Sequence, residues 1–211
     1  PDDEGLKIDK DECLKIQQLI DEHLTSQGVK SLLNEPISIY DRDNFRKEME
    51  KASLSTKELK MRNNLKHTIQ VGIDKDPDFF KPLAERLEKL LELNKLERIT
   101  QLQLLDEYHQ MQDDIINRKK KAEDLGLITE SEIALNNTLK TIFDSKSVEM
   151  TKLIFNEIEG ELGIIGWTEK GTVKKDMENK IVKLLIEKMD RADARVKSKE
   201  IVELIRKNTY A

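Results

Sequence analysis

The chain has 211 residues, of which 37% are hydrophobic and another 37% are charged, while aromatic residues contribute only 4%. With only eight glycines and four prolines, this composition is typical of amphipathic helices and argues against a sheet-rich domain. The net charge of −5 excludes the broad positive field of a dedicated duplex-DNA-binding protein, although it is compatible with a local basic patch.

Cysteine content and hydropathy indicate a cytoplasmic protein. The single cysteine, Cys13, cannot form an internal disulfide, which fits a reducing compartment. No run approaches the roughly 18 apolar residues of a membrane span, and the N-terminus lacks the basic and apolar regions of a signal peptide. We therefore expect no membrane partner. Because the sequence begins at Pro1 without an initiator methionine, we expect either a processed product or a fragment of a longer protein, and we favour the fragment.

The first 52 residues predict two helices and an apolar connector. Apolar residues at helical spacing, Cys13 among them, predict a first helix over residues 9–27. Residues 35–40 form a short apolar connector. A second helix follows as far as residue 52, with Asp41 or Asp43 as its N-cap.

The next helix is predicted between a capping box and a glycine. Ser55 and Glu58 have the spacing at which each side chain can bond the other's backbone amide. The apolar positions that follow have the helical period, and Gly72 is predicted to end the helix.

A further helix is predicted to start again at Asp76 and Pro77, a cap followed by a proline in the first turn. Pro82 interrupts this pattern, because a proline inside a helix removes a hydrogen bond. We therefore place the start of the continuous helix nearer Phe80.

The longest helix is predicted over residues 100–125, with a polar middle and with Gly126 at its end. Its inward residues are predicted to be Leu102, Leu105, Ile115, Ile116 and Ala122. A second capping box, Thr129 and Glu132, predicts a helix over residues 129–142, and Ser147 is predicted to cap another that ends at residue 162.

Residues 162–177 contain the only tryptophan, Trp167. Two glycines break the preceding helix here, and Thr168 is placed to cap a helix over residues 172–188. That helix has one apolar stripe: Val173, Met177, Ile181, Leu184, Leu185 and Met189. We predict that Trp167 is buried against the start of this stripe, or alternatively anchors an interface. A last short helix with Val196, Ile201, Val202 and Ile205 completes the chain.

Together these patterns predict an all-α protein, a single domain over residues 1–211 with roughly eight to nine helices. Residues 189–211 form its polar C-terminal helix and tail. We find no fixed-period repeat and no low-complexity linker that would divide the chain.

Motifs for catalysis or metal binding are weak. The sequence has no GxxxxGK[ST] loop to hold a triphosphate. His109 has Asp106 and Asp113 within one helical turn, which is more typical of a solvated histidine than of a zinc site. Asp78 and the later Glu178–Lys180 triplet match the residue types of a nuclease signature. In such nucleases the carboxylates that hold the divalent ion lie on strands, whereas both pieces here lie in helical patterns. We predict no catalytic, cofactor-binding or metal-binding residue in this chain.

Two basic runs allow either of two interpretations. Arg118, Lys119, Lys120 and Lys121 are candidates for DNA contact, because neutralising phosphates releases counterions. Acidic residues flank the run, which favours an ordinary solvated surface. Lys174 and Lys175 form the second run and, with Trp167, are candidates for an interaction site.

Three stretches in order resemble one family. The first, residues 69–89, is an apolar segment followed by an Asp-Pro turn, an aromatic pair and a leucine-rich helix. The second, residues 125–134, is a Leu-Gly-Leu sequence followed by a capping box. The third, residues 162–177, is the Trp-Thr segment followed by a basic helix. Over residues 32–186 the chain resembles the C-terminal helical region of the restriction (R) subunit of type I restriction-modification enzymes.

The resemblance implies a non-catalytic piece of a site-specific, ATP-dependent deoxyribonuclease whose nuclease and motor domains precede it. ATP and Mg²⁺ are then expected for the full-length subunit and not for this region. The implied partners are the modification and specificity subunits, which form the methyltransferase core, or the subunit's own motor domains. The alternative is a helical domain that contacts duplex DNA through its basic patches.

Overall fold

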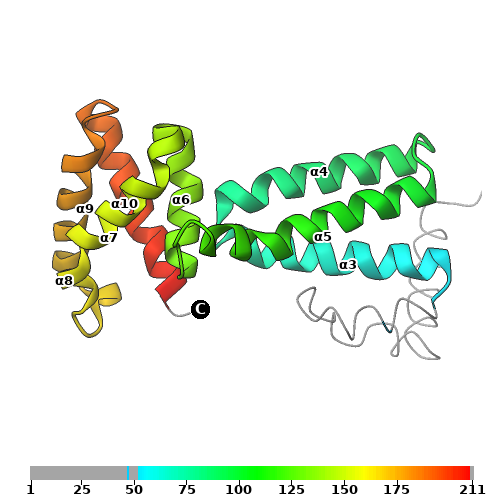
Figure 1. Ribbon diagram of the computed structural model, residues 1–211, viewed down its shortest axis with the longest axis horizontal. Helices are drawn as coiled ribbons and strands as arrows, with labels where there is room; N and C mark the ends of the chain where they lie inside the picture. Colours follow the sequence, from blue (N-terminus) through cyan, green and yellow to red (C-terminus); the bar gives the residue numbers. More distant parts are fainter. Residues whose placement is uncertain (1–46, 48–51, 210–211) are drawn as a thin grey trace, which may run out of the picture.

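The computed structural model describes residue 47 and residues 52–209, and Figure 1 shows that they form an all-helical, elongated body. The predicted all-α class is therefore confirmed. The described residues contain seven main helices, so the expected count of eight to nine is slightly off. The helix predicted at residues 9–27 and nearly all of the one ending at residue 52 lie outside the described part. The single-domain assignment over residues 1–211 stays a prediction.

Three long helices in succession form the first half of the body, called here the three-helix unit: α3 (Leu54–Ile73), α4 (Pro77–Lys95) and α5 (Gln101–Glu123). Each packs on the next, and α3 also packs on α5. The buried core of the unit consists of Met61, Leu65, Ile69, Phe80, Leu83, Leu87, Leu90, Leu104, Leu105, Tyr108, Met111 and Ile115.

The start of α3 differs from the prediction. Ser53, not Ser55, is the N-cap, and its hydroxyl accepts a hydrogen bond from the Thr56 amide at 3.3 Å. Ser55 lies inside the helix and instead accepts a bond from Gln101 on α5 at 3.3 Å. Ser53, Ser55 and Thr56 can each serve as an N-cap by residue type, so the capping-box spacing of Ser55 and Glu58 did not identify the cap that is used.

The end of α3 lies one residue beyond the predicted glycine. Gly72 does not end the helix, which continues to Ile73. Gly72 is buried, and a Cβ on it would lie 2.5 Å from ring carbons of Phe80. The glycine therefore permits the close approach of α3 and α4 rather than a left-handed turn.

The start of α4 was placed too late. The helix begins at Pro77, with the Asp76 side chain accepting from the Phe79 amide, and Pro82 lies within it. Pro82 is exposed, so the carbonyl that loses its helical donor can be hydrated. The lost hydrogen bond therefore destabilises α4 less than it would in the buried middle of a helix.

Two expectations for α5 were wrong. Leu102 is 64% exposed, because it lies in the first turn at the open end of the unit, and the middle of the helix buries Tyr108 and Met111 completely. Thr100 and Gln103 form its capping box, and Gly126, just beyond the helix, has the left-handed φ of 73° expected of a glycine stop.

The remaining helices form the second half of the body, called here the α6–α10 unit (Figure 1). They are α6 (Glu130–Phe143), α7 (Ser147–Glu157), the four-residue α8 (Glu159–Leu162), α9 (Gly171–Leu185) and α10 (Arg191–Thr209). Short 3₁₀ turns, η2 (Asp144–Lys146) and η3 (Trp167–Glu169), precede α7 and α9. Helix α10 packs on α9 and also returns to α6, which closes the unit.

The core of this unit is larger than that of the other. Its buried members are Ala134, Leu135, Leu139, Phe143, Ile154, Ile158, Trp167, Val173, Met177, Ile181, Leu185, Ala194, Ile201, Val202, Leu204 and Ile205. The apolar stripe of α9 is confirmed, with Leu184 and Met189 partly buried at its margin. Trp167 is buried as predicted, with 4% of its surface exposed.

Of the three helix starts predicted in this unit, one is confirmed and two differ from the prediction. Thr129 and Glu132 form the expected capping box of α6. Thr168 does not cap α9, which starts at Gly171 without any side-chain cap, because η3 buries Thr168. Ser147 is not a cap either, since η2 leads directly into α7.

The segment predicted as one helix ending at Leu162 divides into α7 and α8. The last helix is longer than expected, with 19 residues, and Val196 is 60% exposed on it. Burial of one face against α9 and α6 stabilises this polar helix more than its own composition does.

Candidate functional site

The two units meet at a group of polar side chains, called here the polar junction: Asp76 before α4, Arg118 on α5, and Glu130 and Asn137 on α6. Arg118 Nε donates to Asp76 Oδ2 at 2.9 Å, and Nη1 donates to Glu130 Oε2 at 2.7 Å. Its Nη2 lies 2.7 Å from the same Asp76 oxygen in an ion pair. Asn137 Nδ2 donates to the same Asp76 oxygen at 2.7 Å. One guanidinium therefore ties together three helices.

The ion pair at the centre of the polar junction is almost shielded from solvent, whereas the Glu130 side chain at its edge is 43% exposed. The Arg118 side chain is 10% exposed and that of Asp76 1%. Burial raises the pKa of Asp76, and Arg118, followed by Asn137 and the Phe79 amide, opposes that rise. Burial alone would lower the pKa of Arg118, but Asp76 and then Glu130 raise it above its ordinary value. Arg118 therefore stays charged.

Aromatic rings complete the surroundings of Arg118. Its guanidinium carbon lies 5.5 Å from the ring centroid of Phe79 and 5.8 Å from that of Phe80, within the range of cation–π attraction. The two rings pack edge to face, with centroids 5.0 Å apart. The aromatic pair of the sequence thus positions the arginine that links the units.

Three further polar contacts cross between the units. Thr138 Oγ1 donates to Asp78 Oδ2 at 2.6 Å, and Asn208 Nδ2, near the end of α10, donates to the Lys75 carbonyl oxygen at 2.8 Å. Lys207 lies 3.8 Å from Asp74. A small apolar cluster of Ala122, Leu127 and Ile133 adds to them. The junction is therefore largely polar, with apolar cores on either side.

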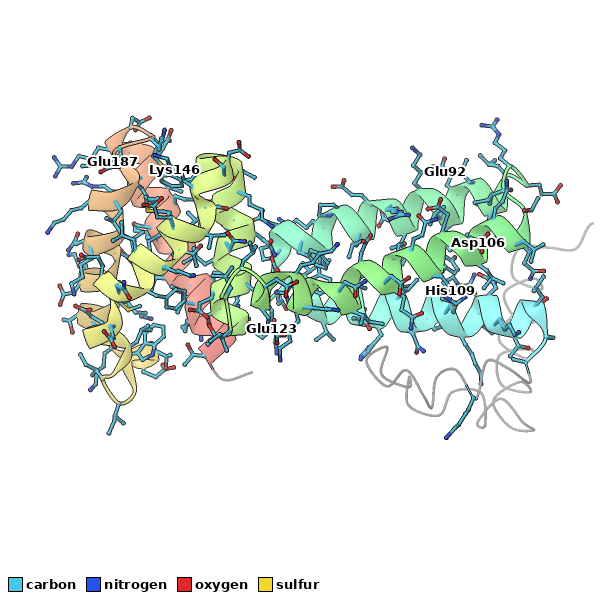
Figure 2. The ribbon with its side chains drawn as sticks, viewed as in Figure 1. Glu92, Asp106, His109, Glu123, Lys146 and Glu187 are labelled. Carbon is cyan, nitrogen blue, oxygen red and sulfur yellow. The ribbon has the colours of Figure 1, made fainter. Side chains whose placement is uncertain are left out.

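A groove of about 410 Å³ lies against the polar junction, between α4, α5 and α6. Its apolar lining comes from Phe79, Pro82, Leu83, Ala122, Leu125 and Ile133. Lys121 and Lys140 add positive charge, and Asp78 and Asp114 add negative charge. In Figure 2, the label Glu123 identifies the end of α5, where the chain passes towards the second unit.

The structure separates the residues of the predicted basic run. Arg118 belongs to the polar junction, whereas Lys119, Lys120 and Lys121 are exposed on α5. Lys174 is partly exposed and Lys175 exposed at the start of α9, in the other unit. Their roles in DNA or protein contact stay predictions.

The weak catalytic and metal motifs do not assemble in the described residues. Asp106 and His109 lie on adjacent turns of α5 and are exposed, as labelled in Figure 2. Between residues 52 and 209 no three His, Cys, Asp or Glu side chains lie together as metal ligands. Asp78 bonds Thr138 and Lys180 bonds Glu161, so the two pieces of the nuclease-like pattern have partners in their own surroundings.

Sequence reasoning missed most of the polar junction. It identified Asp76 only as a helix cap and Arg118 only as part of a basic run, and it assigned nothing to Glu130 or Asn137. The sequence signal for this site is the Asp76–Pro77 helix start next to an aromatic pair. The partners of Asp76, Arg118 and Asn137, lie 42 and 61 residues further along the chain, so local spacing does not identify them.

Among the described helices, none combines the length and apolar character that crossing a membrane requires. Comparison of the chain with protein-family models, with curated proteins and with solved structures gave no match.

Proposed function

We propose that this chain is a non-catalytic assembly region of a type I restriction enzyme's R subunit, which binds the methyltransferase core or braces the motor domains. The resemblance over residues 32–186 supports the family. In such a subunit the nuclease and motor domains that precede this region carry out DNA cleavage and ATP hydrolysis. This region then binds a partner and catalyses no reaction.

The observation that carries the proposal is the polar junction. A brace must hold two ends at a constant separation and angle. Arg118 bonds Asp76 and Glu130 simultaneously, which fixes the direction in which α6 leaves the three-helix unit. Such directional bonds specify one orientation, whereas apolar contact alone allows sliding.

Co-elution tests this proposal. The 211-residue chain is mixed at micromolar concentration with the modification and specificity subunits of a type I enzyme, and separately with the motor domains. We expect a complex with one of them, and we expect Arg118→Ala to weaken it. Absence of both complexes, while the full-length subunit still binds the core, would refute the assembly role.

DNA contact is the second candidate function, and the exposure of Lys119, Lys120 and Lys121 on one turn of α5 favours it. If these lysines replace counterions, DNA affinity falls steeply with salt. Changing all three to alanine would then reduce that dependence. Binding that is absent, or that ignores salt, would exclude this function.

A further inference from the structure

We infer that the loop between α8 and α9, residues 163–166, docks onto a partner protein whose surface is apolar at its centre and carries lysine or arginine around it. The inference deepens the proposed assembly role, on which it rests, by naming the contact surface and the kind of partner. It depends on the exposure of Ile165, on the hydrogen bonds that hold the loop and on the glutamates beside it.

The loop presents apolar side chains to solvent. Ile165 is 93% exposed, more than any other large apolar residue in the described part of the chain, and Ile164 beside it is 38% exposed. In Figure 1 the loop after α8 lies in the part of the α6–α10 unit that is away from the three-helix unit. Neither unit therefore covers these two isoleucines, and such an exposed apolar pair is typical of a contact surface for another molecule.

The loop is held in place before any partner binds. The Gly163 amide donates to the Glu159 carbonyl oxygen and the Ile164 amide to the Glu161 carbonyl oxygen, both at 3.1 Å. The Trp167 amide donates to the Ile164 carbonyl oxygen at 3.0 Å, and the Trp167 side chain is buried. Trp167 thus supports the loop from the core. Because a fixed loop loses little conformational entropy on binding, an isoleucine exposed on it is an effective anchor.

The segment around the loop is acidic. Residues 153–169 contain four glutamates and neither lysine nor arginine. Glu157 and Glu159 are exposed and form no ion pair with any described residue. Lys170, directly after the segment, is exposed as well, so the carboxylates outnumber the ammonium groups here.

The other cations that approach this segment already have partners. Lys180 Nζ lies 2.7 Å from Glu161 Oε1. Arg206 Nη2 lies 2.6 Å from Glu203 Oε1, and Glu203, followed by Glu169, raises the pKa of Arg206. An excess of carboxylates therefore remains beside the loop. It disfavours DNA, an anionic membrane and the same loop of a second copy, and it favours lysine or arginine on the partner.

The test uses two amphipathic peptides, one of leucine and lysine and one of leucine and glutamate, as probes of the two kinds of surface. Isothermal titration calorimetry measures their affinity for the full chain, and amide chemical-shift mapping locates the contact. We expect the lysine peptide to bind with its largest shifts at residues 159–166. The glutamate peptide should not bind there, because the carboxylates beside the loop repel it.

A matched pair of isoleucines tests the apolar anchor. Ile165→Ala and Ile128→Ala remove the same atoms at exposures of 93% and 75%, but only the first lies in the loop. We expect about tenfold weaker binding of the lysine peptide for Ile165→Ala and no change for Ile128→Ala. Both melting temperatures should stay near that of the wild type, since neither side chain is buried.

A matched pair of charge changes tests the acidic surroundings. E157Q/E159Q and E88Q/E123Q remove equal charge at exposed positions, but only the first pair lies beside the loop. We expect the first pair to weaken binding of the lysine peptide and to reduce its salt dependence, and the second to change neither.

Largest shifts away from the loop, equal losses within either matched pair, or equal binding of the two peptides would overturn the inference. So would binding to phosphatidylcholine vesicles that Ile165→Ala abolishes, because the loop would then contact a membrane.

The same variants keep this inference separate from the assembly role. A complex with the methyltransferase core or the motor domains that Ile165→Ala leaves unchanged refutes the loop as the contact, while the assembly role stands. Absence of both complexes, while the lysine peptide still binds at residues 159–166, refutes the assembly role and supports the loop as a docking surface for a basic protein.

Discussion

The two halves of the molecule bury apolar cores by different routes. In the three-helix unit, α3 packs on both α4 and α5, so the contact between the most distant helices passes over a single helix. In the α6–α10 unit, α10 closes the group of shorter helices by packing on α6, although the 47 residues 144–190 separate the two helices in the chain. The contacts of the first unit therefore pass over at most one helix, whereas the second unit also has a contact between helices that three others separate.

The difference shows what each unit needs for stability. Long helices with continuous apolar faces pack with little help from their connections. The α6–α10 unit contains the irregular segment between α8 and α9, where Gly166 adopts a left-handed φ of 69° and the buried Trp167 follows. Changes in that segment should affect the second unit more than the first.

Trp167→Ala should have the largest effect. Removing a large buried aromatic side chain costs about 3–5 kcal/mol of unfolding free energy. We expect faster amide exchange throughout α9 and α10 and little change in α3, measured by hydrogen exchange with thermal unfolding as the global readout.

Ile165→Ala is the control for this variant, because Ile165 is 93% exposed two residues away and should change stability by less than about 0.5 kcal/mol. A shift in melting temperature below about 2 °C for Trp167→Ala would contradict its role in the core.

Arg118→Ala tests the connection between the units. It leaves Asp76 buried without its cationic partner, which we expect to cost about 3 kcal/mol. Because Arg118 opposes the rise in the pKa of Asp76, the variant should also take up a proton there more readily. Hydrogen exchange should increase at the ends of both units that face each other.

Asp76→Asn in the Arg118→Ala background removes the unpaired carboxylate and should restore part of the loss. If Arg118→Ala alone costs less than about 1 kcal/mol, the two units are held together by their apolar contacts instead.

The capping boxes provide a matched pair, one in each unit. Thr100→Ala and Thr129→Ala each remove a hydroxyl that accepts an N3 amide, at 3.3 and 3.2 Å, and each should cost about 1 kcal/mol. Exchange should rise in the first turn of α5 for one and of α6 for the other. Thr172→Ala, at an exposed position on α9, is the control; a loss there as large as at the caps would argue against the capping explanation.

The smallest expected effect is a pH dependence of stability that only one of the two capping boxes should show. Burial disfavours ionisation of Glu132, but the Thr129 and Ile128 amides, which donate to it at 2.8 Å, lower its pKa below the ordinary value. A depressed pKa contributes stability that is present above the unfolded value of about 4.3 and is lost as the pH falls through the folded value.

Glu132→Gln should therefore cost about 0.5 kcal/mol at pH 7 and less in acid. Gln103, the corresponding residue in α5, does not titrate, so Gln103→Ala should have the same effect at both pH values. Urea unfolding at about pH 7 and pH 3 measures both. A Glu132→Gln effect that does not shrink in acid would show that the carboxylate charge adds nothing to the cap.

The sequence by itself determined the features that depend on local periodicity and on the first turns of helices. It predicted the helical class, the apolar stripe of α9, the Thr129–Glu132 box and the burial of Trp167, because side chains three or four residues apart share a face and helix amides need nearby acceptors. It also located most helix boundaries to within a few residues.

Only the tertiary structure decided which of several equivalent local patterns was used. Ser53 caps α3 in place of Ser55, Gly72 meets the ring of Phe80 instead of ending a helix, and Leu102 is exposed because the unit ends beside it. Arg118 stands in a run of similar basic residues, yet it alone is buried, since α4 and α6 bring carboxylates to it from 42 residues before and 12 residues after. A contact between such distant positions depends on how the helices pack, which no local pattern of charge or hydrophobicity encodes.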